Sequence, residues 1–309
     1  MSIITYLKNR LVQKPKIIVI CGPTATGKTS LSIEIAKKYN GEVISADSRQ
    51  VYIGLDIGSA KVTHEEMQGI PHYMIDVTNA QDVFSVQEYV MLARKKITEI
   101  LARKKIPIIC GGTGMYIDAL IYNQSFPNVP ANNELRNKLS KLNTEELFLQ
   151  LQSKDPLRAQ NIDHKNPVRL IRALEIIESL GKVPKQKQSK KYNVLFMGLD
   201  IPKQQHNKII EKRIIERLEN DNMLKEAEGL YAQGVSYTRM EELGLEYRYM
   251  AYYLQKKVSY SEMIQQLTTK TIQFAKRQRT WFKKNKNIHW FNPYNDTQEI
   301  ESTIRKFIK

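Results

Sequence analysis

The 309-residue sequence has few cysteines, no long apolar run and comparatively few acidic residues, and each shortage argues against a class of protein. Its two cysteines, Cys21 and Cys110, both end apolar segments, so we expect buried free thiols rather than disulfides or a zinc site. No apolar stretch approaches the roughly 18 residues of a membrane span. Basic residues interrupt the first 16 positions, so we expect no secretory leader. These features predict a soluble cytoplasmic protein.

Acidic residues number only 32 against 48 Lys and Arg, which gives a formal net charge of +16. This excess favours a polyanionic partner larger than a nucleotide. A basic protein that is merely kept soluble by its charge is the alternative. The five histidines are scattered, and their spacing suggests neither a metal site nor a catalytic triad.

The clearest motif is the segment GPTATGKT, which matches the phosphate-loop pattern G-x-x-x-x-G-K-[ST]. An apolar strand-like run precedes it and a helical pattern follows it, as in known phosphate loops. Backbone N–H groups and the helix N-terminus attract an anion, Lys28 neutralises the outer phosphate, and Thr29 offers its hydroxyl to Mg²⁺. A glycine-rich turn without a ligand is the alternative. We predict a polyphosphate site formed by Gly22, Pro23, Thr24, Ala25, Thr26, Gly27, Lys28 and Thr29.

Strand-like and helix-like segments alternate over residues 1–122. Such alternation predicts a parallel sheet with helices on both faces and a ligand site at the carboxyl ends of the strands. The expected strands are 16–21, 42–46, 72–76 and 106–110, and the expected helices are 28–39, 86–103 and one that begins after residue 114.

The alternation of strand-like and helix-like segments stops after residue 122. Residues 123–191 have apolar residues at helical spacing without a strand pattern, which predicts a small all-helical insertion domain that ends in a basic loop, 182–191. Residues 193–200 return to strand character, and helices follow, including a long one over 259–284. The expected organisation is therefore a core over 1–122, an insertion over 123–191, and completion of the core with basic C-terminal helices over 192–309.

Two polar segments follow predicted strands. Asp47 comes directly after a strand, where its carboxylate can accept a proton or bind Mg²⁺ through water, while Ser48, Arg49 and Gln50 form a hydrogen-bonding set suited to a heterocyclic base. A polar turn with an aspartate helix cap is the alternative. Thr113, in a Gly-Gly-Thr-Gly segment, faces a ligand or simply caps the next helix.

The segment 270–286 contains seven basic residues and no acidic one. On one helix, Ile272, Phe274, Ala275 and Phe282 are expected to dock, and the basic residues are expected to form an outward stripe. Such a stripe can follow a phosphate backbone. We therefore expect Lys276, Arg277 and Arg279 to contact nucleic acid. A solvated charged face is the alternative.

Taken together, the chain resembles the tRNA dimethylallyltransferase (tRNA isopentenyltransferase) family. The resemblance covers nearly the whole chain and is carried by 22–29, 45–52, 56–61, 69–76, 111–116, 166–175 and 274–282 in that order. It implies a P-loop NTPase-like α/β core with a helical insertion that grips the anticodon stem-loop. It also implies an enzyme that moves a dimethylallyl group from dimethylallyl diphosphate to the exocyclic amine of the adenosine 3′ of the anticodon, tRNA position 37.

The resemblance implies roles for particular residues. Asp47 takes the proton of the amine, Lys28 assists the departing diphosphate with Mg²⁺ on Thr29, and Thr113 lies near the reacting centre. An arginine that aids the diphosphate is either Arg213 or Arg217. Contacts with tRNA are implied for Asp47, Ser48, Arg49, Gln50, Arg136, Arg169, Arg172, Lys276, Arg277 and Arg279.

We expect a monomer. Three alternatives remain open from the residues themselves: a P-loop nucleoside or small-molecule kinase, a non-catalytic P-loop protein that binds RNA, and an adenylate isopentenyltransferase that acts on a free nucleotide. The net charge and the basic segment favour tRNA over a free nucleotide.

Overall fold

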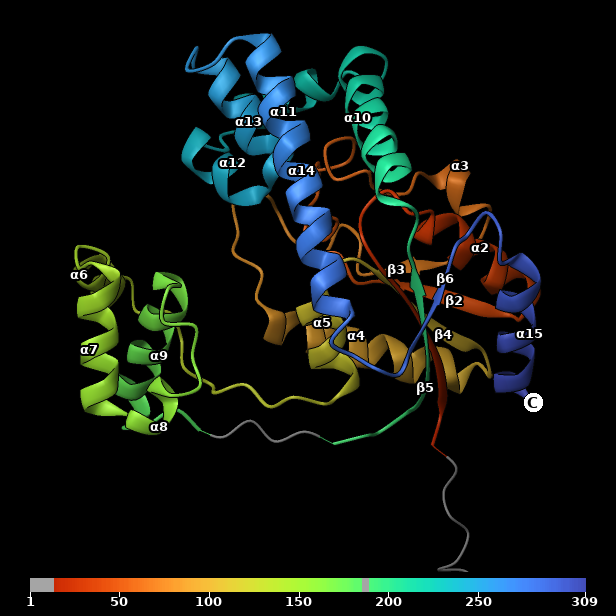
Figure 1. Cartoon of the computed structure of the whole chain (residues 1–309), viewed down its shortest axis with the longest axis horizontal. Coiled ribbons are helices and arrows are strands. Elements are labelled where there is room, and N and C mark those ends of the chain that lie inside the picture. Colours follow the sequence, from red (N-terminus) through yellow and green to blue (C-terminus); the bar gives the residue numbers. More distant parts are fainter. Residues whose placement is uncertain (1–13, 185–188) are drawn as a thin grey trace, which may run out of the picture. The chain divides into compact units, whose positions relative to one another are not determined.

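The computed structural model describes residues 14–184 and 189–309, and its centre is a six-stranded parallel sheet (Figure 1). Residues 1–13, where we expect no secretory leader, and residues 185–188 of the predicted basic loop are not among the described residues. The strand order is β3-β2-β4-β1-β5-β6. The strands are β1 (Lys16–Cys21), β2 (Gly41–Ser45), β3 (His72–Tyr73), β4 (Ile106–Gly111), β5 (Asn193–Leu199) and β6 (Ile288–Phe291).

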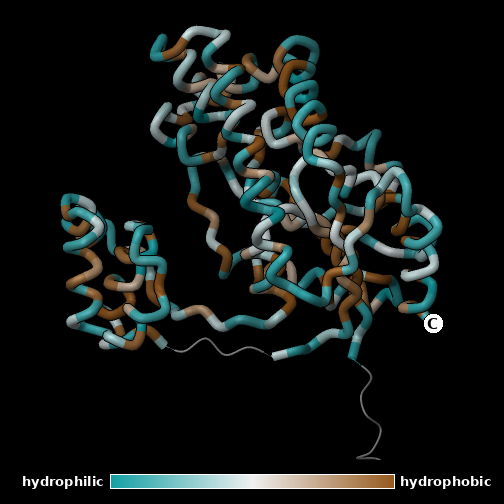
Figure 2. Tube along the Cα trace, viewed as in Figure 1, coloured by the Kyte–Doolittle hydropathy of each residue, from teal (hydrophilic) through white to brown (hydrophobic). Residues whose placement is uncertain are grey.

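The sheet forms because its strands are apolar on both faces. β1 reads KIIVIC with only its first residue partly exposed, as expected for a strand covered on both sides. Figure 2 shows hydrophobic residues concentrated along these strands. Residue Ile18 pairs with Ile108 of β4 and with Leu195 of β5, which places β1 in the interior of the sheet.

Helices cover the two faces of the sheet. On one face, α2 (Lys28–Lys38) and α15 (Thr297–Ile308) share a core cluster with alternate residues of β1, β4 and β5. α4 (Val86–Ala102) and α5 (Gly114–Ile121) contact β4 on the other side (Figure 1). The predicted parallel α/β core is confirmed. Short α3 (His64–Met67) lies in the connection between β2 and β3.

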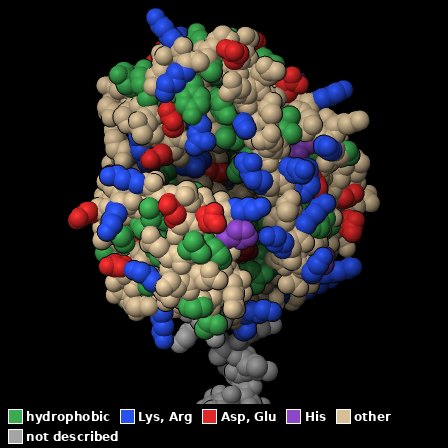
Figure 3. Space-filling model, turned by 60° about the vertical axis from the view of Figure 1, so that its left-hand side comes forward, with side chains coloured by type: hydrophobic (Ala, Val, Ile, Leu, Met, Phe, Trp, Pro, Cys, Tyr) green, Lys and Arg blue, Asp and Glu red, His purple; other side chains and the backbone are tan. Residues whose placement is uncertain are grey.

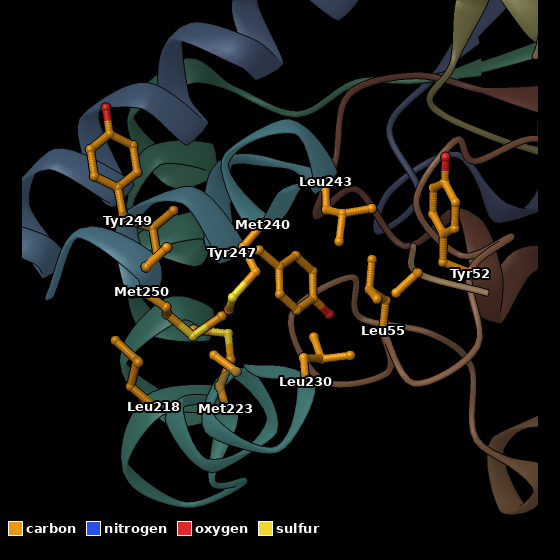
Figure 4. Close-up of a cluster of buried hydrophobic side chains, with 14 of the residues drawn as sticks. Tyr52, Leu55, Leu218, Met223, Leu230, Met240, Leu243, Tyr247, Tyr249 and Met250 are labelled. Atoms are coloured by element: carbon orange, nitrogen blue, oxygen red, sulfur yellow. The ribbon is translucent and has the colours of Figure 1, made fainter. Parts of the chain in front are cut away.

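A helical region follows β5 and packs on the loop after β2. It comprises α10 (Lys203–Glu219), α11 (Met223–Ala232), α12 (Tyr237–Leu243), α13 (Leu245–Leu254) and α14 (Tyr260–Phe282). Tyr247 lies fully buried among side chains that include Met240, Leu230 and Leu55 (Figure 4). Its hydroxyl donates to Glu226, and the Glu226 carboxylate accepts the backbone N–H groups of residues 56, 57 and 58. This cluster fixes the loop that borders the cavity described below.

Residues Asn123–Ser189 form a second compact unit with its own core. Its helices are α6 (Asn133–Leu139), α7 (Thr144–Lys154), α8 (Pro156–Ala159) and α9 (Pro167–Leu180). Side-chain caps set several helix starts: Asn143 accepts the N–H groups of Glu145 and Glu146, and Asn166 accepts that of Arg169. No helix within the described part of the chain is both long and apolar enough to cross a membrane.

The structure differs from the sequence-based expectations at two strands. β6 was not expected, because IHWF is short and follows a strongly basic segment. β3 is only two residues long, because Met74 and Asp76 adopt positive φ angles and bend the chain out of the strand.

Candidate active site

A cavity of about 530 Å³ lies at the carboxyl ends of β1, β2 and β4. The loops that follow these strands supply most of its wall, and α10, α13 and α14 close the rest. Every lining residue belongs to the compact unit that contains the sheet. The predicted phosphate loop, Asp47–Gln50 and Thr113 all line this one cavity, except Gly22 and Pro23 at the start of the loop.

The phosphate loop turns tightly between β1 and α2. Gly22 has a φ of 140°, and a Cβ there would lie 2.4 Å from the carbonyl oxygen of Leu199, so only glycine fits. Ala25 and Gly27 also have positive φ angles, of 59° and 77°. The backbone therefore curls around the amino end of α2, where N–H groups and the helix dipole attract an anion.

Two cations, Lys28 and Arg213, line the cavity without a salt bridge to any described residue. Desolvation lowers the pKa of Lys28, and the charge of Arg213 acts in the same direction. Desolvation also lowers the pKa of Arg213, with Arg217 contributing, and its guanidinium has no hydrogen bond or salt bridge to a described residue. Among the described residues, Lys28 donates only to the carbonyl oxygen of Pro23. A bound anion such as diphosphate would stabilise the charged forms of both side chains.

Asp47 and Thr113 are connected through the backbone of Ser48. The Ser48 N–H donates to Thr113 Oγ1 at 3.0 Å, and the Thr113 N–H donates to the Ala46 carbonyl oxygen at 3.1 Å. Thr113 makes no side-chain cap to α5, so its hydroxyl joins the loops after β2 and β4 rather than capping the helix. Asp47 Oδ1 accepts the N–H of Arg49 at 2.8 Å, which leaves its other oxygen available to the cavity.

Arg49 and Gln50 line the cavity but also hold neighbouring segments in place. Arg49 donates to the Glu242 carbonyl oxygen at 2.9 Å. Gln50 accepts from Ser45 Oγ and donates to the Ala60 carbonyl oxygen. These contacts fix the shape of the wall beside Asp47.

Helix α14 contributes cavity residues that the sequence analysis did not assign to the site. Thr271, Phe274 and Gln278 lie on one face of the helix and line the cavity. The Thr271 hydroxyl is buried and has no hydrogen-bond partner within the described residues. Phe274, expected to dock in the core, is 39% exposed and faces the cavity instead. The spacing of 271, 274 and 278 along one helical face was the signal in the sequence.

The structure bears on two expectations about arginines: that Arg279 points outward, and that either Arg213 or Arg217 lies near the diphosphate. Arg279 is wrong as a member of the outward stripe: it forms a bidentate salt bridge with Asp200, with an N···O distance of 2.7 Å, and its side chain is 19% exposed. Lys276 and Arg277 are exposed as expected. Arg213 lines the cavity, whereas Arg217 does not and instead donates to the carbonyl oxygens of Ile57 and Gly58.

The arginines of the second unit that were expected to contact tRNA differ in their ion pairs and in their exposure to solvent. Arg136 and Arg172 both contact the buried carboxylate of Glu175, and Arg172 also donates to the carbonyl oxygen of Val129. Burial opposes ionisation of Glu175, but the hydrogen bonds from Arg136 and its neighbours outweigh it and lower its pKa. Arg169 is exposed, with Asp163 3.9 Å away. Both paired arginines therefore have a structural role, and Arg169 is the most accessible.

The residues at the loop fit a magnesium ion that is held mainly by a substrate. Thr29 is exposed at the start of α2, beside Lys28. The described residues contain no cluster of three or more His, Cys, Asp and Glu side chains that could hold a metal. Mg²⁺ is commonly bound by one or two protein oxygens together with phosphates and water, and Thr29 with Asp47 supplies oxygens of this kind.

A family model described as IPP transferase matches residues 50–285. The chain belongs to the IPP transferase family. A relative named tRNA dimethylallyltransferase, from Anoxybacillus flavithermus (strain DSM 21510 / WK1), is 39% identical over 287 residues, which is 91% of this chain and 92% of the relative. A second, from Bacillus cereus (strain AH187), is 40% identical over 290 residues, 91% of each. The family expected from the sequence is confirmed.

Solved structures of IPP transferases share the fold. The full-length tRNA isopentenylpyrophosphate transferase from Bacillus halodurans has a TM-score of 0.73 at 36% identity, covering 95% of this chain and 97% of that one. A eukaryotic dimethylallyltransferase acting on tRNA has a TM-score of 0.81 at 25% identity, covering 94% of this chain and 80% of that one. The cavity of this IPP transferase thus sits in a fold found across the family.

Positive charge dominates the surface, whereas the cavity wall carries both cations and carboxylates. The face drawn in Figure 3 carries more Lys and Arg side chains than Asp and Glu side chains, in agreement with the net charge of +16. A surface of this kind attracts polyanions over distances set by the ionic strength.

Proposed function

We propose that this IPP transferase moves a dimethylallyl group from dimethylallyl diphosphate to the exocyclic amine of adenosine 37 in tRNA and releases diphosphate. The observation that carries the proposal is the single cavity that brings a phosphate loop, two unpaired cations and the Asp47 carboxylate together. The names of the curated relatives and of the solved structures support the same reaction.

The chemistry explains why these groups are needed. An exocyclic adenine amine is a weak nucleophile because its lone pair is delocalised into the ring. The allylic carbon compensates, since its bond to the diphosphate oxygen breaks readily when the leaving group is stabilised. Lys28, Arg213 and the loop N–H groups would stabilise the charge that develops on the departing diphosphate. Mg²⁺ bound with Thr29 would add electrophilic assistance to this leaving group.

Proton transfer completes the reaction. The new bond joins the allylic carbon to the amine nitrogen, the electron pair of the broken carbon–oxygen bond leaves with diphosphate, and the amine loses one proton. Asp47 would accept it, because this residue lines the cavity and its second carboxylate oxygen has no donor among the described residues. Thr113 and Ser48 would hold the base beside it. The base must leave its stack to enter a cavity of this kind.

The RNA would be held outside the cavity by exposed cations. Lys276 and Arg277 on α14 and Arg169 in the second unit are the accessible candidates. Arg136 and Arg172 would contribute mainly by holding the unit's structure through Glu175. Phosphate contacts of this type position an RNA without reading its sequence.

The direct test mixes the protein with an unmodified anticodon stem-loop, Mg²⁺ and dimethylallyl diphosphate, followed by digestion to nucleosides and mass spectrometry. We expect prenylated adenosine and free diphosphate in equal amounts. A matched RNA with inosine at the target position lacks the amine and should stay unmodified. Transfer of phosphate from ATP, with no prenylated product, would instead identify a kinase.

A further inference from the structure

Thr24, in the middle of the phosphate loop, has both of its backbone polar groups bound by the protein. Its N–H donates to Gln278 Oε1 at 2.9 Å, and its carbonyl oxygen accepts from His206 Nε2 at 2.7 Å. Gln278 comes from α14 and His206 from α10, which lie 254 and 182 residues away in the sequence. Two distant helices therefore fix the peptide planes on either side of this residue.

The two partners of Thr24 are connected to each other. Arg279, which follows Gln278 on α14, donates to His206 Nδ1 at 3.0 Å. An arginine can only donate, so His206 Nδ1 must accept, and the ring proton must lie on Nε2, where it donates to Thr24. The contacts therefore close a ring from Thr24 through Gln278, Arg279 and His206 and back to Thr24.

The ring is anchored on both sides. Asp200, just after β5, holds the Arg279 guanidinium with both carboxylate oxygens, each 2.9 Å from Nε. Gln278 Nε2 donates to the carbonyl oxygen of Gly112 at 3.0 Å, in the loop after β4. A Cβ on Gly112 would lie 2.3 Å from that nitrogen, so a larger residue there would displace the Gln278 amide. Gln278 and His206 are both buried.

We propose that Gln278, Arg279 and His206 are positioning residues that hold the phosphate loop in its anion-binding shape before any ligand arrives. This inference rests on the proposed function of the cavity and goes beyond it, because it assigns α14 residues to the diphosphate rather than to RNA. The Thr24 N–H is used by the protein and Pro23 has none, so the donors left for diphosphate are those of residues 25–29. A preformed loop avoids the entropy cost of ordering these donors on binding.

The first measurement uses the unaltered protein without ligand. In hydrogen–deuterium exchange, the Thr24 amide should exchange at least about 10-fold more slowly than the Ala25 amide, because only the former is hydrogen-bonded. Equal and rapid exchange of the two amides would overturn the proposal, whatever the variants do.

The second measurement compares affinities of variants. Gln278→Met keeps the side-chain length but removes the amide that makes both hydrogen bonds, and Arg279→Lys keeps the charge but loses the bidentate geometry. For inorganic diphosphate with Mg²⁺, titrated by calorimetry, we expect each variant to bind about 10-fold more weakly, while the affinity for an unmodified anticodon stem-loop changes less than about 2-fold. Under turnover, KM for dimethylallyl diphosphate should rise more than kcat falls.

Two comparison variants separate the roles. Arg277 is exposed and directly precedes Gln278. Arg277→Gln should weaken binding of the stem-loop and leave diphosphate binding unchanged. Lys306→Gln on α15 removes an exposed charge far from the ring and should change neither. If Arg279→Lys instead lost RNA affinity and kept diphosphate affinity, Arg279 would be an RNA contact and the ring would have no positioning role. Diphosphate binding by the unaltered protein without prenyl transfer would contradict the proposed function but leave this inference intact.

Discussion

At the scale of single residues, the Asp47 carboxylate is oriented before a substrate enters. One oxygen accepts the Arg49 N–H at 2.8 Å and the Gln50 N–H at 3.4 Å. The contacts fix the turn after β2 and leave the second oxygen without a hydrogen-bond donor among the described residues. No helix begins directly after Asp47, so the structure has the polar turn but not the helix cap, and the turn keeps Asp47 on the cavity wall.

The variant Asp47→Asn separates the two roles of this side chain. Asparagine keeps an oxygen for the Arg49 N–H but cannot take a proton at neutral pH. We expect the single-turnover rate of prenyl transfer to fall by about 10²- to 10⁴-fold. Affinities for diphosphate and for the stem-loop should stay within about 2-fold, as for small changes at an intact hydrogen bond.

The matched control is Asp221→Asn, which removes an exposed carboxylate before α11 and should leave the rate unchanged. An Asp47→Asn enzyme that turned over as fast as the unaltered one would remove Asp47 from the mechanism.

Glu42, on β2, gives a prediction about pH. Burial opposes its ionisation, but hydrogen bonds from Arg103, Lys105 and Tyr73 outweigh that effect and lower the pKa of Glu42 from 4.5 to about 2. The folded state therefore binds this proton less readily than the unfolded chain. The stabilisation is complete above about pH 4.5 and is lost as the pH falls toward 2.

Denaturant unfolding at several pH values measures this contribution. Glu42→Gln should lower the free energy of unfolding at pH 7 and lower it much less at pH 3, where the wild-type carboxyl is already largely protonated in the unfolded chain. A difference between wild type and variant that did not change with pH would show that packing, and not ionisation, matters at this position.

At the scale of elements, two arginines one turn apart on α10 differ in position: one lines the cavity and the other holds a neighbouring loop. Arg213 and Arg217 are four residues apart on the same helix. Arg213 reaches the cavity, whereas Arg217 donates to two carbonyl oxygens of the loop at residues 57 and 58 and lies 3.6 Å from Glu246.

This separation predicts different outcomes for the same substitution. Arg213→Gln should weaken diphosphate binding by about 10-fold or more and leave the melting temperature nearly unchanged, because charge-assisted contacts to the anion are lost. Arg217→Gln should lower the melting temperature by several degrees, because two buried carbonyl oxygens lose their donor. Calorimetric titration and thermal unfolding of both variants test this, and reversed outcomes would contradict the assignment.

Much of the core could be predicted from the sequence, because it depends on local patterns. The phosphate loop, four strands of apolar residues and the long basic helix are each visible within short windows. β6 was missed because four residues, IHWF, pair with β5 through contacts that no local pattern encodes. The direction of Arg279 was missed for the same reason: its partners, Asp200 and His206, are more than 70 residues away.

Position along a helix also limited the prediction of the site. The basic composition of 270–286 is visible in the sequence, but which face meets the cavity depends on how α14 packs against α10 and α13. Thr271, Phe274 and Gln278 share a face that could have been drawn from helical spacing. Only the fold shows that this face borders the phosphate loop.

At the scale of the whole molecule, the net charge of +16 predicts strong dependence of RNA binding on salt. If about five phosphates are neutralised, stem-loop affinity should fall on the order of 10³-fold between 50 and 200 mM salt. Filter binding across this range measures the slope of log affinity against log salt. The double variant Lys276→Gln with Arg277→Gln should reduce that slope by roughly 1.5, and a flat response of the unaltered protein would mean that its charge serves solubility alone.

The closed ring around Thr24 also joins two binding events. One turn of α14 exposes Lys276 and Arg277 and, on its inner side, holds Thr24 through Gln278 and Arg279. If RNA docks on this turn and the loop binds the donor as proposed, any displacement of the turn would be transmitted to the loop. Thermodynamic reciprocity then requires that the factor by which RNA alters donor affinity equals the factor by which the donor alters RNA affinity. The sign and size of this coupling are therefore one quantity, which can be measured by titrating either ligand in the presence of the other.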